Sequence, residues 1–191
     1  KEMNKIRFGT DGWRAIIGRD FTFDNVERVA QAYADLLTGD ARASLKPPLR
    51  PIPLGYDRRF LSDEFAKAIV SVFTGNGLSV TISKNYCPTP CISWMTKVLE
   101  APGGVMVTAS HNPYPWNGIK FKEGYGGSAS PAFTKRLEER IEKNDAEGRT
   151  PKKGPFAAVF FDPFKDYVQQ LRSQIDVGQI RRAGWKIAFD P

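Results

Sequence analysis

The segment Thr108–Pro113 gathers several side chains that could carry out chemistry. Ser110 stands next to His111, which is the single histidine of the chain. A serine hydroxyl is a poor nucleophile unless a base takes its proton, but a serine that rests as phosphoserine needs no base to donate its phosphoryl group. Pro113 and Pro115 restrict the backbone just beyond, so the loop is predicted to be stiff as well as polar.

An ordinary turn is the competing interpretation of this segment. Ser110 and Asn112 are residue types that satisfy turn hydrogen bonds, and His111 can be a hydrogen-bonded loop residue. A serine hydrolase that uses Ser110 and His111 is disfavoured, because neighbouring residues on an extended loop point apart. The chain also lacks the Gly-x-Ser-x-Gly nucleophile elbow at this serine.

Two basic side chains are candidates for holding phosphate. Lys120 follows Ser110 by ten residues, on a short strand predicted to return from the loop, so its ammonium either faces the same cleft or points to solvent. Arg14 ends the glycine-bounded tip Gly9–Arg14, where a guanidinium can clamp a phosphate bidentately. Most surface arginines have no such specific role, so neither signal is decisive alone.

Two further clusters have both a structural and a functional interpretation. Asp57, Arg58 and Arg59 follow a predicted strand, where they either brace the loop by ion pairing or form a solvated charge cluster. Cys87 and Cys91 suggest redox or metal chemistry, but two of the three residues between them are prolines and no second ligand cluster follows. A structural turn before a helix is the favoured interpretation of the cysteine segment.

Alternating patterns of apolar residues predict the elements that must position these side chains. A hairpin is expected with arms 6–8 and 15–17, and later strands at 52–56, 78–82, 104–107, 119–121 and 185–189. Helices are expected from caps at Thr22, Ser62 and Ser130, from Thr89, and over 164–175. Strands that alternate with helices indicate an α/β fold with a mixed, largely parallel sheet sandwiched between helices. Ligands gather at the carboxyl ends of such strands, where Thr108–Pro113 follows strand 104–107.

Composition sets broad limits on function. The 191 residues are 41% hydrophobic, which excludes wholesale disorder, and the net charge of +7 favours anionic partners without choosing among phosphate esters, nucleic acid and acidic lipid. The four tryptophans are scattered rather than interleaved with basic residues, which argues against a base-stacking platform. No apolar run approaches the roughly 18 residues of a membrane span, and only two cysteines occur. A reducing, cytoplasmic location is therefore expected.

Four motifs in order resemble those of the α-D-phosphohexomutases, the phosphoglucomutase and phosphomannomutase superfamily. Thr108–Pro113 followed by Asn117–Lys120 resembles the active-site serine loop of that family. Phe8–Arg14 resembles its amino-terminal signature, Gly55–Arg59 its Gly-x-Asp-x-Arg segment, and Pro88–Pro90 its Pro-Thr-Pro turn. Together these motifs cover about residues 6 to 123 and are jointly specific.

The resemblance implies a reaction and assigns roles. Ser110 would be the phosphoserine that exchanges a phosphoryl group with a hexose 1- or 6-phosphate (glucose or mannose), through a hexose 1,6-bisphosphate intermediate. Lys120, Arg14 and His111 would handle protons and stabilise charge near that group, as phosphoryl transfer requires. The supporting residues of the phosphate loop would be Thr108, Asn112, Asn117, Asp57 and Arg59.

The resemblance also implies parts that this chain lacks. Mg²⁺ would bind the Ser110 phosphate together with an Asp-x-Asp-x-Asp-Arg loop, and no such loop occurs here. Residues 1–155 would form domain 1, and 156–191 a connecting helix and the first strand of a truncated domain 2. We therefore expect a phosphosugar substrate, contacts with later domains, no nucleic-acid or membrane partner, and an inactive fragment. The alternative is a non-catalytic module that binds phosphate or nucleic acid, with binding that weakens steeply as salt increases.

Overall fold

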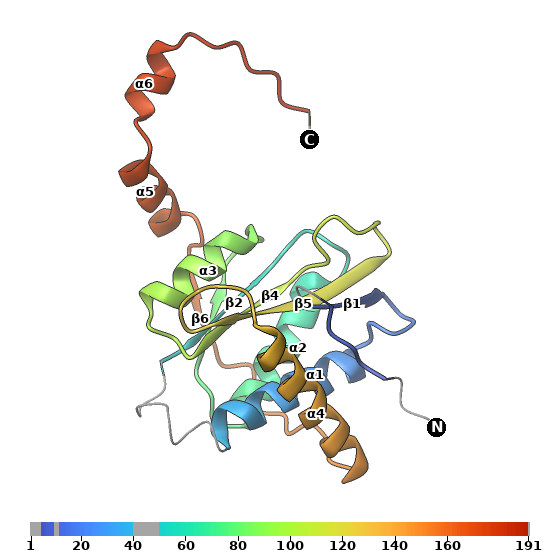
Figure 1. Cartoon of the computed structure of the whole chain (residues 1–191). Coiled ribbons are helices and arrows are strands. Elements are labelled where there is room, and N and C mark those ends of the chain that lie inside the picture. Colours follow the sequence, from blue (N-terminus) through green and yellow to red (C-terminus); the bar gives the residue numbers. More distant parts are fainter. Residues whose placement is uncertain (1–4, 10–11, 40–49, 191) are drawn as a thin grey trace.

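A mixed six-stranded sheet forms the centre of the molecule, with helices on both of its faces (Figure 1). The structure is a computed structural model that describes residues 5–9, 12–39 and 50–190. Its elements are β1 (Trp13–Ile16), α1 (Phe23–Thr38), β2 (Ile52–Tyr56), α2 (Ser62–Gly75), β3 (Val80–Ser83), α3 (Thr89–Val98), β4 (Gly103–Val107), β5 (Trp116–Glu123), α4 (Pro131–Ala146), β6 (Val159–Phe161), α5 (Lys165–Gln174) and α6 (Val177–Arg182).

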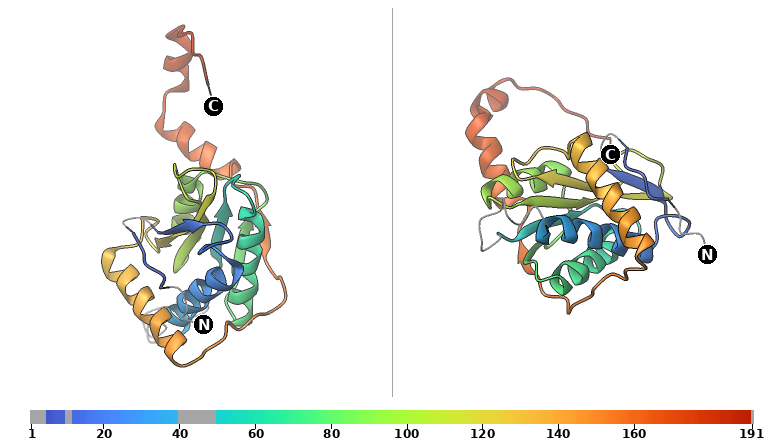
Figure 2. Two further views of the ribbon diagram at one scale, coloured as in Figure 1. Left: turned by 90° about the vertical axis from the view of Figure 1, so that its right-hand side faces the viewer. Right: turned by 60° about the horizontal axis from the view of Figure 1, so that its bottom comes forward.

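The strand order is β1-β5-β4-β2-β3-β6. Strands β4, β2, β3 and β6 pair in parallel, and β5 pairs antiparallel with both β4 and β1. Helices α1, α2 and α4 cover one face and α3 covers the other, as the two views of Figure 2 show. The predicted fold class, a mixed and largely parallel sheet between helices, is confirmed. The carboxyl ends of β2, β3 and β4 consequently lie at one edge of the sheet.

The main core lies between the sheet and α1, α2 and α4. Tyr33 from α1 stacks on Phe121 of β5 with ring centroids 4.5 Å apart, and Phe73 from α2 lies 5.5 Å from Tyr33. A smaller cluster of Cys87, Cys91, Ile92 and Met106 fills the α3 side. Both faces of β4 are therefore buried, and its last residues are held firmly where the serine loop begins.

The helix starts agree with the sequence at two of the three predicted caps. The hydroxyls of Thr22 and Ser130 accept hydrogen bonds from the amides of Asn25 and Phe133, each 3.3 Å away. The predicted cap at Ser62 is wrong, because Leu61 precedes α2 in a left-handed conformation and makes no side-chain cap. The Ser62 hydroxyl instead donates to Asp57 Oδ1 at 2.8 Å, so this serine belongs to the polar network beside the serine loop.

The predicted amino-terminal hairpin is only partly present. Residues 5–8 form no strand, and β1 pairs with β5, so that Arg14 lies opposite Gly118. The reason is that β5 is longer than the sequence indicates and offers β1 a complete neighbour. At Gly118 a Cβ would lie 2.6 Å from the carbonyl oxygen of Trp13 and 2.7 Å from that of Thr108, so only glycine fits there. A bridge joins Gly9 and Gly12, and tip residues 10–11 lie outside the described residues.

The last part of the chain extends away from the sheet (Figures 1 and 2). Strand β6 pairs with β3 at the sheet edge, and Tyr167 of α5 packs against the cysteine cluster. The strand predicted at 185–189 is wrong: these residues are irregular and Phe189 is 86% exposed. A strand needs a neighbour for its backbone groups, and none is present there among the described residues. No helix in the described ranges combines the length and apolarity needed to cross a bilayer.

Candidate functional site

The serine loop leaves the carboxyl end of β4 and presents Ser110 to solvent. Ser110 has a φ of 58°, in the left-handed region that non-glycine residues rarely occupy. Its amide donates to Thr108 Oγ1 at 3.0 Å, and the amide of Asn112 donates to the carbonyl of Ala109 at 3.1 Å. Such backbone strain persists only where the surroundings hold it in place, and it occurs most often at functional sites. The loop turns sharply at Ser110 and leaves its hydroxyl exposed.

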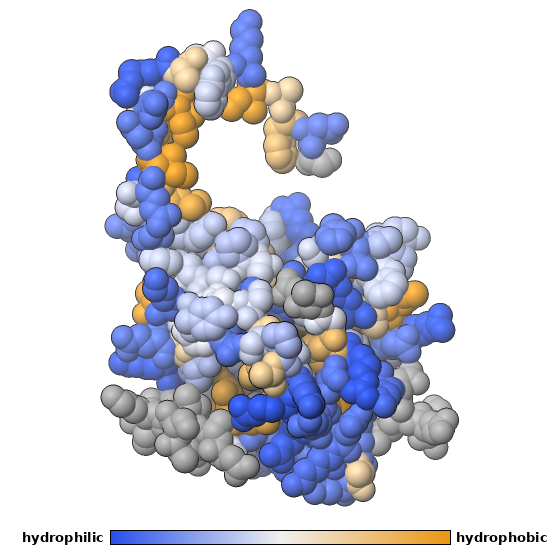
Figure 3. All heavy atoms as spheres, in the orientation of Figure 1, coloured by the Kyte–Doolittle hydropathy of each residue, from blue (hydrophilic) through white to orange (hydrophobic). Residues whose placement is uncertain are grey.

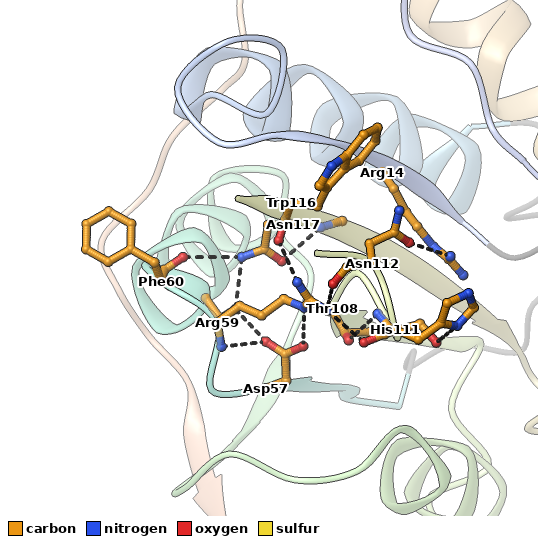
Figure 4. A network of polar contacts seen from close by, with 12 residues as sticks. Arg14, Asp57, Arg59, Phe60, Thr108, His111, Asn112, Trp116 and Asn117 are labelled. Carbon is orange, nitrogen blue, oxygen red and sulfur yellow. Dashed lines mark hydrogen bonds and ion pairs between the residues drawn. The ribbon is translucent and has the colours of Figure 1, made fainter. Parts of the chain in front are cut away.

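The guanidinium of Arg59 holds this loop through its backbone (Figure 4). Nη2 donates to the carbonyls of Ser110 at 2.8 Å and Asn112 at 2.7 Å, and Nη1 donates to those of Pro113 and Trp116, each at 3.0 Å. Nε lies 3.3 Å from Asp57 Oδ2, so every nitrogen of the guanidinium has a partner. Arg59 therefore fixes the loop, and its nitrogens are occupied by protein groups.

A network of polar side chains holds Arg59 in place. Asp57 Oδ1 accepts from the amide of Arg59 at 3.0 Å and from the hydroxyl of Ser62, while the amide of Asp57 donates to the carbonyl of Val107. The amide nitrogen of Asn117, a fully buried residue, donates to Ser62 Oγ at 2.9 Å. Figure 4 shows this network running from Asn117 on β5 to Asp57 beyond the end of β2. It links the serine loop to two strands.

Arg14 and His111 lie on the other side of the loop. Arg14 projects from β1, and its Nη1 donates to Asn112 Oδ1 at 2.9 Å. The exposed His111 ring has Nδ1 3.4 Å from Ser110 Oγ. In Figure 4 both side chains lie on the side of the loop away from Arg59. The structure thus brings an imidazole to the serine hydroxyl and a guanidinium to Asn112 of the same loop.

Lys120 is a buried lysine on β5. It is 6% exposed and pairs across the sheet with Met106 of β4, so it lies on the face opposite to Ile119 and Phe121. A Cβ added at Gly12 would lie 3.1 Å from its Cγ, which shows that the backbone of Gly12 packs directly on this lysine. The surface position that the sequence left open for Lys120 is therefore wrong, because Lys120 is buried and lies against Gly12.

An open hollow of about 530 Å³ contains the serine. Its lining consists of Asp57, Arg58, Arg59, Phe60, Ser110, Asn112 and Tyr114. Four of these, Asp57, Arg59, Ser110 and Asn112, are site residues that the sequence predicts, whereas Phe60 and Tyr114 are not predicted by any motif. The rings of Phe60 and Tyr114 are 70% and 89% exposed, and no periodic pattern marks them, since both lie in loops. Ser62 was missed as a site residue because its position suggested a helix cap.

The cysteine pair lies in the small cluster beneath α3, apart from the serine loop. Cys87 and Cys91 are free and buried. The pKa of the Cys87 thiol is lowered, mainly by a hydrogen bond with Cys91 and to a smaller extent by one with Ser83. The pKa of Cys91 is raised by the same hydrogen bond with Cys87 and by burial. Residues 5–9, 12–39 and 50–190 contain no group of three acidic, histidine or cysteine side chains arranged to hold a metal.

The chain has a mixed sheet between two helical layers, and a strained, exposed serine follows the carboxyl end of strand β4. It is therefore an α/β/α domain that presents a serine loop. It belongs to the phosphoglucomutase/phosphomannomutase family, because the model of that family's alpha/beta/alpha domain I matches residues 5–148.

Known proteins of this family are similar to the chain. A phosphoglucosamine mutase of Acetivibrio thermocellus is 32% identical over 185 residues, which is 96% of this chain and 39% of that protein. A phosphoglucomutase of Staphylococcus saprophyticus is 35% identical over 142 residues, 71% of this chain and 24% of that protein. A Thermus thermophilus structure described as a phosphomannomutase superposes with a TM-score of 0.76 at 34% identity, over 92% of this chain and 37% of that one. The chain thus spans between about a quarter and two fifths of the length of these relatives.

Proposed function

We propose that the chain is the phosphoserine-bearing part of a phosphohexomutase, in which Ser110 carries the phosphoryl group that interconverts a hexose 1-phosphate and a hexose 6-phosphate. The observation that carries the proposal is the presentation of Ser110. Its hydroxyl is exposed in an open hollow, while the backbone that bears it is fixed by Arg59. A rigid, outward-facing hydroxyl suits a group that must receive and return a phosphoryl group to a sugar in solution.

In the donor half-reaction the bond between phosphorus and Ser110 Oγ breaks as a bond forms between phosphorus and a sugar hydroxyl. The hydroxyl proton leaves and Ser110 Oγ ends protonated, so a hexose monophosphate becomes a bisphosphate. The reverse transfer from the other phosphate restores phosphoserine. We assign Arg14, which lies beside Asn112, and Lys120 to charge stabilisation and proton transfer, with His111 assisting at Ser110 Oγ.

The supporting residues act through the loop in this proposal. Arg59 donates to the loop carbonyls and is itself paired with Asp57, Thr108 accepts from the Ser110 amide, and Asn117 ties the network to β5. Because these contacts go to backbone or to each other, we propose that they position Ser110 and do not react. Preorganised positioning of this kind is a main source of rate enhancement in phosphoryl transfer.

Magnesium is implied by the family, and a phosphate on Ser110 would supply oxygen ligands of the type that it takes. The described residues do not by themselves fit a magnesium site, since they contain no acidic cluster and Asn112 Oδ1 already accepts from Arg14. We propose that its remaining ligands, and the groups that select the sugar, come from segments beyond this chain, which spans 39% of its Acetivibrio relative.

Mass spectrometry tests the central claim. The intact chain, isolated from cells, is expected to carry a phosphate adduct that peptide analysis maps to Ser110 and that is absent from a Ser110→Ala variant. An adduct at another residue overturns the donor role. In a coupled mutase assay the 191-residue chain is expected to show no more turnover than Ser110→Ala, and turnover well above that control would contradict the proposal that it lacks part of the active site.

A further inference from the structure

Two thiols lie together outside the serine loop, and the proposed phosphoryl transfer uses neither of them. Cys87 and Cys91 are the only cysteines in the sequence, and both are free. They share the small buried cluster with Ile92 and Met106, and a hydrogen bond joins the two thiols. Because the chain has no third cysteine, oxidation within one molecule has a single possible disulfide product.

The two cysteines differ in how firmly their backbones are held. Cys91 lies in the first turn of α3, where it is fully buried and its amide donates to the carbonyl of Pro88 at 3.0 Å. Cys87 lies in the irregular segment between β3 and α3, and although its own thiol is buried, residues 84–86 and 88 around it are exposed. An exposed irregular segment opens more readily than a packed helical turn. A small oxidant is therefore expected to reach Cys87 first.

Cys87 also contacts the end of the strand that leads to the serine loop. Its amide donates to the carbonyl of Tyr56 at 3.0 Å, and a Cβ at Gly55 would lie 2.8 Å from its Sγ, so the sulfur packs directly on the backbone of β2. Asp57 follows Tyr56 and pairs with Arg59, whose guanidinium holds the loop. A displacement of Cys87 consequently acts on the residues that position Arg59.

The chemistry of the pair follows from its thiols. The thiolate is the reactive form of cysteine, and the hydrogen bond with Cys91 lowers the pKa of Cys87. When the Cys87 thiolate attacks hydrogen peroxide, the O–O bond breaks, Cys87 becomes a sulfenic acid, and the departing hydroxide takes up the thiol proton to form water. The Cys91 sulfur then attacks the sulfenic sulfur, the S–O bond breaks, and a second water leaves with the Cys91 proton. Two thiols are oxidised by two electrons in all, and one peroxide is reduced to two waters.

We propose that Cys87 and Cys91 form a reversible redox pair that peroxide converts into an intramolecular disulfide, and that this disulfide draws Cys87 away from β2 and loosens the serine loop. Bonded sulfurs lie much closer together than hydrogen-bonded thiols, so one cysteine must move. Cys91 is fixed in a helix, which leaves Cys87 as the residue that moves. This redox control acts on the geometry of the loop and is independent of the proposed phosphoryl transfer.

Mass spectrometry of the peroxide-treated chain tests the disulfide. Both cysteines fall in one tryptic peptide, residues 85–97, which is expected to lose two hydrogen atoms, to resist alkylation by iodoacetamide, and to regain both thiols in dithiothreitol. The Cys91→Ala variant is expected to stop at a sulfenic acid on Cys87 that dimedone captures. The pairing is overturned if both thiols of the treated parent chain remain open to alkylation, or if its disulfides join two molecules only.

Hydrogen exchange tests the effect on the loop. Peptides covering residues 108–118 are expected to exchange roughly fivefold faster in the oxidised parent chain, as loss of one hydrogen bond does, and to return to the original rate in dithiothreitol. The double variant Cys87→Ala, Cys91→Ala is the matched control: its loop exchange should not respond to peroxide, which also oxidises methionine in a way that dithiothreitol does not reverse. Unchanged loop exchange in a chain that carries the disulfide overturns the redox control, as does equal acceleration in the double variant or in α1. Phosphorylation of Ser110 does not enter either measurement, so failure here is distinct from failure of the proposed function.

Discussion

Replacing Arg59 with lysine keeps the positive charge and removes the planar fork that holds the serine loop. An ammonium has three donors on one atom and cannot reach four carbonyls and Asp57 together. The carbonyls of Ser110 and Pro113 take part in exposed hydrogen bonds and regain water, whereas the bonds to Asn112 and Trp116 are partly buried. Removing a charged donor from a half-buried acceptor costs about 1.5 kcal/mol or more.

We therefore expect Arg59→Lys to lower the free energy of loop opening by about 2 kcal/mol, since lysine recovers part of the lost contact. This corresponds to a roughly thirtyfold rise in the opening equilibrium. Hydrogen exchange followed by mass spectrometry can measure it in peptides that cover residues 108–118, where the amides of Ser110, Asn112 and Trp116 are hydrogen-bonded.

Arg58→Lys is the control, because it makes the same change at the exposed neighbouring position and is expected to leave loop exchange unaltered. Peptides from α1 should exchange as in the parent protein in both variants. If Arg59→Lys accelerates loop exchange less than threefold, the guanidinium does not hold the loop. If α1 accelerates as much as the loop does, the effect is global and the assignment of Arg59 as a loop clamp is wrong.

Three further predictions test other parts of the structure. Gly12→Ala is expected to destabilise the chain by about 3 kcal/mol in urea unfolding, because φ is +94° and a Cβ would overlap the Ile119 carbonyl oxygen; Gly18→Ala, at +79° in open space, should cost only about 1 kcal/mol, and equal losses would refute the packing argument. Burial, with a smaller contribution from Glu123, raises the pKa of Tyr33 above its ordinary value of 10. The contribution of Tyr33 to the free energy of unfolding is therefore fully present below pH 10 and decreases above it, where Tyr33 ionises in the unfolded chain. A Tyr33→Phe variant should lose stability less steeply there, and identical alkaline curves would contradict this assignment. Iodoacetamide should label Cys87 before Cys91 in the folded chain, since only the Cys87 pKa is lowered; mass spectrometry that finds Cys91 labelled first would oppose this order.

Elements with a complete local signal could be predicted from the sequence. Helix α1 has a capping threonine, an apolar stripe and a closing glycine within one segment, and strand β2 was predicted with its observed bounds. Elements whose pairing partners are distant in the sequence could not be predicted. Strand β6 exists because Val159 pairs with Thr81, 78 residues earlier, and β1 pairs with β5 instead of the preceding segment. Local periodicity carries no information about such neighbours.

The same distinction applies to the candidate site. The residues of the serine loop and the Asp57–Arg59 cluster could be named from residue types and motifs, yet the contacts by which Arg59 holds the loop could not. Arg59 recognises backbone carbonyls, which every residue has, so no sequence pattern marks its targets. The role of Ser62 could not be predicted either. A serine at the start of a helix is locally expected to cap that helix, whereas its observed partner Asp57 is brought to it only by the fold.

The contacts that shape the loop at Ser110 are made by its backbone and not by its hydroxyl. Arg59 grips the Ser110 carbonyl, and Thr108 accepts from its amide, so the left-handed conformation does not depend on what the side chain bears. A phosphate on Oγ would add negative charge without removing either of these backbone contacts. A residue that alternates between hydroxyl and phosphate needs such independence, since a loop held by the serine hydroxyl itself would have to rearrange in every cycle. In our proposal the strain at Ser110 is therefore maintained by its neighbours in both states, and the reacting oxygen remains free to exchange phosphorus.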